Sequence, residues 1–212
     1  MAAGRFVAFE GGEGTGKSTQ TRMLAAALEK SGLTVVTTRE PGGTAGAEAI
    51  RALLLDPDGE NWNPRAEALL FAAARSDHVE RLILPAIHRG DWVICDRYLD
   101  SSRAYQGGGS GLKDADLMAL HQIGSAGLLP DLTILIEVAP EICASRLSAR
   151  DIGGSDRIGG RDGAYHGRVA SAFEAIAESE PDRFARIDGN GSAQETHENV
   201  MAALTERLGD PA

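Results

Sequence analysis

A glycine-rich segment near the amino end has the residue types needed to hold phosphate groups. Residues 11–18 read Gly-Gly-Glu-Gly-Thr-Gly-Lys-Ser, which matches the pattern G-x-x-x-x-G-K-[ST]. Glycines let the backbone turn its N–H groups toward phosphate oxygens, and a helix that starts directly behind them adds partial positive charge. Lys17 can then reach the β- and γ-phosphates, and the hydroxyl of Ser18 can ligate Mg²⁺.

This segment follows an apolar run and leads into a stretch of helical composition, which is the context the pattern requires. A glycine-rich turn without a ligand is the alternative interpretation. We expect a site for ATP and Mg²⁺, with these ATP-binding residues: Gly11, Gly12, Glu13, Gly14, Thr15, Gly16, Lys17, Ser18 and Thr19.

Two acidic residues compete for a place in the magnesium shell. Asp96 ends the apolar run Trp92–Asp96, as the carboxylate of a Walker B segment does. Glu10 lies at the end of the first apolar run, next to the glycine-rich segment. An aspartate at the end of a strand can also be a turn residue or a helix cap. We expect Asp96 and Ser18 to hold the ion, with Glu10 as the competing ligand.

The arginines outside this segment gather in places that suit a second phosphorylated substrate. They form three groups: Arg39 with Arg51, Arg75 with Arg97, and Arg150 with Arg157 and Arg161. Transfer between two phosphorylated substrates requires preorganised cations more than a strong base. The guanine-reading motif N-K-x-D of GTPases does not occur in the sequence, and motor ATPases are usually larger. The distribution favours a nucleoside monophosphate kinase.

The elements that must position these residues alternate between strand and helix. Apolar runs rich in β-branched residues predict strands at Arg5–Glu10, Thr34–Arg39, Trp92–Asp96, Asp131–Val138 and Arg183–Asp188. Helical periodicity and composition are found at Lys17–Ser31, Ala45–Leu55, Pro64–Arg89, Asp114–Ala126, Pro140–Arg150, Ala164–Glu178 and Ala193–Leu208. This alternation predicts an α/β fold with a mostly parallel sheet. Pro85 should kink or divide its helix, and the glycine-rich stretch 150–163 is interpreted as a mobile loop.

Length, charge and cysteine usage narrow the class of protein further. A chain of 212 residues without a linker suits a single domain over residues 1–212. A net charge of −10 provides no overall field that would attract nucleic acid or an anionic membrane. No apolar run approaches the roughly 20 residues of a membrane span, and the amino end lacks an export signal. Cys95 and Cys143 lie in apolar runs and are expected to be buried and reduced. We therefore expect a cytoplasmic protein with no nucleic-acid or membrane partner.

Three further blocks resemble those of bacterial thymidylate kinases. They are Arg39-Glu40-Pro41-Gly42-Gly43-Thr44, Asp96-Arg97-Tyr98 and Ala104-Tyr105-Gln106-Gly107-Gly108-Gly109. Their order and spacing agree with the family, and the resemblance extends from about Arg5 to Ile187. It implies a homodimer with a P-loop NTPase fold, built on a five-stranded parallel sheet flanked by helices on both faces.

The activity implied by this resemblance is transfer of the ATP γ-phosphate to dTMP, giving dTDP and ADP for dTTP synthesis. Two alternatives stay open. One is a kinase of the same fold for another monophosphate, such as dUMP, dCMP or AMP. The other is a P-loop protein that binds nucleotides without catalysis, although Lys17, Ser18, Asp96 and Arg97 are all present.

The resemblance also implies roles for individual residues at the acceptor. Phe71 resembles the ring that stacks on thymine, and Arg75, one helical turn later, the donor to the pyrimidine O4. Tyr105 resembles the residue that packs against deoxyribose, and Arg97 the one that bridges the acceptor and donor phosphates. The remaining implied dTMP-binding residues are Arg39, Glu40, Arg51, Ser102 and Gln106. Without the resemblance, core packing is the favoured interpretation of Phe71, and a solvated side chain is the alternative for Arg75. Surface ion pairs are an equal alternative for Glu40, Arg51 and Arg97.

The stretch 150–163 is expected to act as a lid over ATP and to carry the catalytic arginine. Some thymidylate kinases have an arginine within the P-loop, but here the candidate positions hold Gly14 and Thr15. Asp156-Arg157-Ile158 resembles the lid block of the family, so Arg157 is the first choice among the three arginines of this stretch. The predicted catalytic residues are therefore Lys17, Asp96, Arg97 and Arg157.

Two features around the lid depart from the family pattern or extend it. The acidic residues that usually follow the Asp-Arg-Ile block are replaced by Gly159, Gly160 and Arg161. Arg146 precedes the lid by one helical segment and is predicted to stack on adenine.

Overall fold

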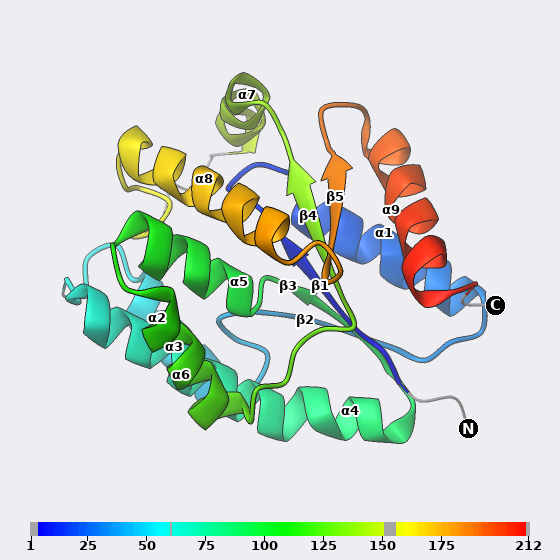
Figure 1. The fold of residues 1–212 in the computed structure, drawn as a ribbon, viewed down its shortest axis with the longest axis horizontal. Coiled ribbons are helices and arrows are strands. Elements are labelled where there is room, and N and C mark those ends of the chain that lie inside the picture. The colour runs from blue at the N-terminus through cyan, green and yellow to red at the C-terminus, as the bar shows by residue number, and fades with distance from the viewer. Residues whose placement is uncertain (1–3, 60, 151–155, 211–212) are drawn as a thin grey trace.

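The computed structural model describes residues 4–59, 61–150 and 156–210, and within them the strands form one parallel sheet. The order is β2-β3-β1-β4-β5, with every neighbouring pair parallel. The strands are β1 (Phe6–Glu10), β2 (Val35–Arg39), β3 (Trp92–Asp96), β4 (Leu132–Glu137) and β5 (Phe184–Asp188). Their carboxyl ends meet at one edge of the sheet (Figure 1). The predicted α/β fold with a five-stranded parallel sheet is confirmed.

Helices connect the strands and cover the sheet. They are α1 (Lys17–Lys30), α2 (Ala45–Leu55), α3 (Pro64–His78), α4 (Leu84–Arg89), α5 (Leu99–Ser102), α6 (Asp114–Ser125), α7 (Pro140–Arg150), α8 (Gly163–Ser179) and α9 (Ala193–Leu208), together with the π-helical segments η1 (Val79–Ile83) and η2 (Arg103–Gly109). Each boundary predicted from the sequence for these helices and strands lies within one residue of the observed one.

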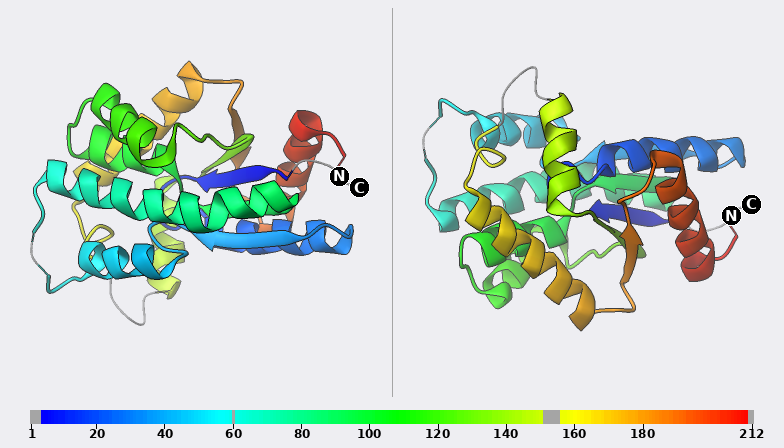
Figure 2. Two further views of the ribbon diagram at one scale, coloured as in Figure 1. Left: turned by 90° about the horizontal axis from the view of Figure 1, so that it is seen from below. Right: turned by 90° about the horizontal axis from the view of Figure 1, so that it is seen from above.

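The alternating side chains of β1 show how the core is divided between the two faces of the sheet. Val7 and Phe9 belong to an apolar cluster that includes residues of α1 and α9. Phe6 and Ala8 point to the other face, where their cluster includes residues of η1 and α4. Helices therefore lie on both sides of the sheet, as Figure 2 shows. Because both faces are covered, all five residues of β1 are buried.

The helix that contains Pro85 is not divided, so one of the two effects expected of this proline does not occur. The segments α3, η1 and α4 follow one another without a break from Pro64 to Arg89. The π-helical turn η1 ends just before Pro85, which is the second residue of α4. Since a π-helical turn shifts the hydrogen bonds by one residue, the chain can accommodate a proline without a loop.

The stretch Leu99–Gly109 is helical, which the sequence analysis did not predict. It comprises α5 and η2, and η2 packs along α8. A Cβ on Gly108 would lie 2.3 Å from the Cβ of Ala172, and one on Gly109 would lie 2.5 Å from the ring of Tyr165. These glycines therefore allow the backbone of η2 to approach α8 closely.

Only part of the predicted lid can be compared with the structure. Residues 151–155 and the side chain of Arg150 lie outside the described residues. Residues 157–160 form turns that lead to α8. Cys95 is buried as expected, whereas the prediction for Cys143 is wrong, because that residue is only partly buried. No helix in the described part of the chain is long and apolar enough to cross a membrane.

Candidate functional site

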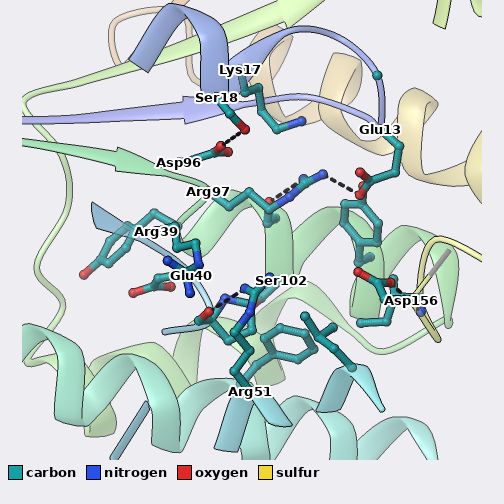
Figure 3. Close-up of a pocket in the computed structure, with 18 of the residues that line it drawn as sticks. Glu13, Lys17, Ser18, Arg39, Glu40, Arg51, Asp96, Arg97, Ser102 and Asp156 are labelled. Atoms are coloured by element: carbon teal, nitrogen blue, oxygen red, sulfur yellow. Dashed lines mark hydrogen bonds and ion pairs between the residues drawn. The ribbon is translucent and has the colours of Figure 1, made fainter. Parts of the chain in front are cut away.

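A cavity of about 510 Å³ opens at the carboxyl ends of β1, β2 and β3. The loops that follow these strands line it, with Lys17 and Ser18 behind β1, Glu40 behind β2 and Arg97 behind β3. Figure 3 shows these side chains converging on one space. Open α/β sheets bind ligands at this edge, so the parallel topology brings together residues that lie far apart in the sequence.

The P-loop connects β1 to α1 and depends on glycine at both ends. Gly11 has φ 138°, and a Cβ there would lie 2.6 Å from the carbonyl oxygen of Ile136. Gly16 has φ 95° and directly precedes α1. Lys17 is buried, and its Nζ donates to the carbonyl oxygen of Gly12 at 2.5 Å. Burial lowers the pKa of Lys17 to about 8, and the positive charge of Arg97 lowers it further.

Ser18 and Asp96 meet at the mouth of the P-loop. The hydroxyl of Ser18 donates to Oδ2 of Asp96 at 2.5 Å, which is the contact dashed in Figure 3. Mg²⁺ in nucleotide sites takes one or two protein oxygens and completes its shell with water and phosphate oxygens. Among the described residues, no group of three or more histidines, cysteines and acids could hold a metal ion alone. A hydroxyl beside a carboxylate therefore fits a magnesium ion that arrives with its nucleotide.

Glu10, the competing metal candidate, faces away from this position. Its buried carboxylate accepts from the backbone N–H groups of Tyr98 at 2.8 Å and Ser101 at 3.0 Å, and from the Ser101 hydroxyl at 2.6 Å. Burial, and then the nearby Asp100, raise the pKa of Glu10 to about 7. Glu10 thus holds the loop after β3 in place and is not among the residues that line the cavity.

Arg97 joins the P-loop to the opposite side of the cavity. It has φ 69°, an unusual backbone conformation for a residue with a side chain. Its guanidinium donates to the carbonyl oxygen of Gly11 at 2.9 Å and to Glu13 at 2.6 Å, and lies 5.0 Å from the ring centre of Tyr105. Arg97 is the main cause that lowers the pKa of Glu13 to about 2. The Tyr105 hydroxyl also donates to Glu13, at 3.2 Å, so one P-loop carboxylate aligns both residues.

Arg75 is held by a buried hydrogen-bond network. Its Nε donates to Glu40 at 2.7 Å, and its Nη2 donates to Ser102 at 2.9 Å and to the carbonyl oxygen of Tyr98 at 3.1 Å. Glu40 also contacts Nδ1 of His78 at 3.0 Å. No hydrogen bond from Nη1 of Arg75 to the described residues is present, and Arg75 lines the cavity. Arg75 is thus not solvated and Glu40 is not in a surface ion pair, because the two form a buried pair at the wall of the cavity.

Phe71 lines the same wall one helical turn before Arg75. It packs against the apolar cluster that contains Tyr105 and Ile158, and it also borders the cavity. The ring therefore packs in the core, as favoured without the resemblance, and it also faces the open space. Its stacking on thymine stays a prediction.

The two arginines of the first group lie at the rim of the cavity. Arg51 donates to the carbonyl oxygen of Pro41 at 2.7 Å. Burial lowers the pKa of Arg51, and the neighbouring Arg39 lowers it further. Arg39 is exposed and forms a surface ion pair with Glu48 at 2.9 Å.

Arg146 reaches the P-loop from α7. Its Nη2 donates to the carbonyl oxygens of Gly189 at 2.9 Å and Gly191 at 3.2 Å, and its Nη1 donates to that of Thr15 at 3.4 Å. It lines the cavity on the side of the P-loop. A flat guanidinium held by three backbone oxygens is suited to stacking on a base.

Arg157, the predicted lid arginine, lies on the acceptor side. Its Nε donates to the carbonyl oxygen of Leu54 at 3.0 Å, and its Nη2 is 3.5 Å from Glu67. Arg161 pairs with the same carboxylate. In this structure neither arginine lines the cavity, although Asp156 and Ile158 do.

Most of the predicted site residues border the cavity. Those that do not are Glu10, Gly11, Gly12, Thr15 and Arg157. The sequence analysis did not select several residues that line or support it: Tyr98, Ser101, Asp156, Ile158 and Glu67. Tyr98, Asp156 and Ile158 belong to the sequence blocks that resemble the family, so they could have been selected. Ser101 and Glu67 belong to no such block.

Comparison with known proteins gives one consistent result. A thymidylate kinase of Rhizorhabdus wittichii is 56% identical over 97% of this chain and 99% of its own length. A thymidylate kinase of Caulobacter vibrioides is 43% identical over 99% of this chain and 100% of its own length. The crystal structure of thymidylate kinase from Ehrlichia chaffeensis covers 95% of this chain, and 99% of that structure's chain is matched, with a TM-score of 0.78 and 30% identity. The family model described as thymidylate kinase matches residues 9–200. With the P-loop, the Asp96-Arg97 pair and the Arg75 network in place, this chain belongs to the thymidylate kinase family.

Proposed function

We propose that this cavity transfers the γ-phosphate of ATP to dTMP, with the donor at the P-loop and the acceptor between Arg97 and Phe71. Membership of the family makes the chain an enzyme that phosphorylates dTMP with ATP, giving dTDP. The assignment of the two sites rests on the position of Arg97, which contacts both the P-loop and the ring of Tyr105. A cation between two phosphate sites can stabilise the charge that spreads over the transferred group.

On the donor side, the backbone of the P-loop and Lys17 hold the phosphates of ATP. Lys17 exchanges its contact with the Gly12 carbonyl for the β- and γ-phosphates, whose charge keeps it protonated. Ser18 and Asp96 hold Mg²⁺, which neutralises charge on the β- and γ-phosphates when it is bound. Arg146 stacks on adenine.

On the acceptor side, the Arg75 network reads the base. Phe71 provides an aromatic face for the pyrimidine, and Nη1 of Arg75 donates to its O4. Glu40 and Ser102 fix the plane of this guanidinium, so a carbonyl acceptor is preferred to the amino group of cytosine. Tyr105, tied to Glu13, lies where it can pack against the sugar. Arg39 and Arg51 supply cations at the rim for the acceptor phosphate.

The catalytic role of the lid arginine stays a prediction. In it, the stretch 150–163 closes over ATP, and Arg157 leaves Glu67 and reaches the γ-phosphate, which excludes water from the reaction.

We also propose that the chain folds as one domain and forms a homodimer in the cytoplasm. One sheet contributes to the three apolar clusters, which supports a single folding unit. The exposed large apolar side chains include Leu53, Leu69 and Ile123, which belong to α2, α3 and α6. Because α3 packs against both α2 and α6, these side chains favour a second copy on this side of the molecule.

An assay of ADP release with Mg²⁺, ATP and a series of monophosphates tests the proposal. We expect strong turnover with dTMP, weaker turnover with dUMP, and little with dCMP, dGMP, AMP or UMP. Turnover led by another monophosphate would keep the fold and overturn the acceptor assignment. Silence in every reaction would favour a protein that binds nucleotides without catalysis.

A further inference from the structure

The carboxylate of Glu67 is almost fully buried, with 1% of its side chain exposed, although Glu67 is not among the residues that line the cavity. It belongs to α3, two helical turns before Arg75. Its Oε1 accepts a hydrogen bond from Gln106 of η2 at 3.0 Å. A buried carboxylate is costly unless its charge and its lone pairs are satisfied, so its other partners decide what it does.

Those partners come from the segment Asp156–Arg161, which lies between the residues outside the described part and α8. Oε2 of Glu67 accepts from Arg161 at 2.5 Å and lies 3.5 Å from Arg157. Nη1 of Arg161 also donates a hydrogen bond to the hydroxyl of Tyr165 at 2.6 Å. One carboxylate of α3 therefore joins two arginines of this segment.

The segment held in this way forms part of the cavity wall. Asp156 and Ile158 both line the cavity, and Ile158 is buried in the apolar cluster against which Phe71 packs. The backbone N–H of Arg157 also donates to the carbonyl oxygen of Leu55, another lining residue. Ion pairs of residues that do not themselves line the cavity thus connect this part of the wall to α3.

We propose that Glu67 is a positioning residue for the acceptor: through Arg161, which stays paired when Arg157 moves to the γ-phosphate, it holds the chain at Ile158 against α3, so that Ile158 closes the base pocket together with Phe71. This inference rests on the proposed function, because it places dTMP in that pocket. Arg161 stands where the family pattern has an acidic residue. Its ion pair with Glu67 is therefore a feature in which this chain departs from that pattern.

Steady-state kinetics of wild type, Glu67→Gln, Arg161→Met and the double variant test this inference. Each single variant should raise the KM for dTMP about tenfold, because a misplaced wall costs affinity, and leave the KM for ATP within about twofold. The double variant should be no worse than Glu67→Gln alone, because both changes break the same contact. Arg161→Lys keeps the charge and should recover part of the loss.

Two controls separate positioning from folding and from the proposed function. Arg186→Met removes an exposed arginine that pairs with Glu137 on β4, and it should leave both KM values unchanged. Melting temperatures show whether Glu67→Gln folds; if it does not, Arg161→Met carries the test, because Arg161 is partly exposed. A folded Arg161→Met enzyme with a wild-type KM for dTMP would overturn the inference. Wild-type protein without activity toward dTMP would instead overturn the proposed function.

Discussion

The donor and acceptor halves of the cavity are built in different ways. The donor half is made of backbone from one continuous stretch, residues 11–18, with Lys17 and Ser18 at the start of α1. The acceptor half is made of side chains from α3, from the loops after β2 and β3, and from η2, joined through buried charges such as the Glu40–Arg75 pair. Backbone in a local motif keeps its geometry wherever the motif folds, whereas a network of side chains depends on the packing of all its elements. We expect donor variants to change turnover and acceptor variants to change recognition.

The largest effect is expected from Lys17→Ala in the donor half. Loss of a preorganised cation at the developing charge should lower kcat by about 10²–10³-fold, with the KM for dTMP little changed. Single-turnover kinetics with saturating ATP measure the chemical step directly. Lys30→Ala at the other end of α1 is the matched control, since it removes an exposed lysine of the same helix. A normal kcat for Lys17→Ala would contradict the assignment of the donor site.

The same contrast explains how much could be predicted from the sequence. The P-loop, the strands and most of the helices depend on local patterns, and their boundaries were predicted to within one residue. The helix over α5 and η2 was missed, because its glycine triplet resembles a turn and is helical only through packing against α8. Pro85 did not divide its helix, because the π-helical turn before it is a tertiary solution that periodicity does not reveal.

The roles of acceptor side chains depended on the family resemblance, and their partners could not be predicted. Glu40 was expected to bind dTMP, yet its carboxylate contacts Arg75 and His78 inside the protein. Glu10 was a metal candidate, yet it binds the backbone after β3. In both cases the local sequence does not indicate the direction in which the acidic side chain points. That direction depends on contacts between elements that are distant in the sequence.

The second prediction concerns Glu10, which links the two halves by accepting hydrogen bonds from Tyr98 and from Ser101 in α5. The pKa of its carboxyl group is near 4.5 in the unfolded chain, and burial raises this pKa to about 7 in the folded protein. Between these values the folded state keeps a proton that the unfolded state has lost, so the stabilisation decreases as pH rises and is lost above pH 7. The shift corresponds to about 3 kcal/mol of unfolding free energy.

Urea unfolding of wild type and Glu10→Gln at several pH values measures this contribution. The amide cannot ionise, so the unfolding free energy of wild type relative to Glu10→Gln should fall by about 3 kcal/mol from about pH 4 to about pH 8. Parallel curves for the two proteins would show that the Glu10 carboxyl group ionises alike in the folded and unfolded states.

The smallest effect is expected from Arg75→Lys in the acceptor half. Lysine keeps a positive charge beside Glu40, so the fold should persist, but it lacks the planar fork that donates to Glu40, Ser102 and the base together. Loss of one charged hydrogen bond to dTMP should lower kcat/KM for dTMP about ten- to hundredfold and bring it closer to that for dCMP. The KM for ATP should stay unchanged, because the hydrogen-bond partners of Arg75 are Glu40, Tyr98 and Ser102, and none of these belongs to the P-loop. Arg65→Lys, an exposed position on the same helix, is the matched control. Equal losses for ATP and dTMP would mean that the two halves are coupled through Arg97 and that recognition and turnover cannot be assigned to them separately.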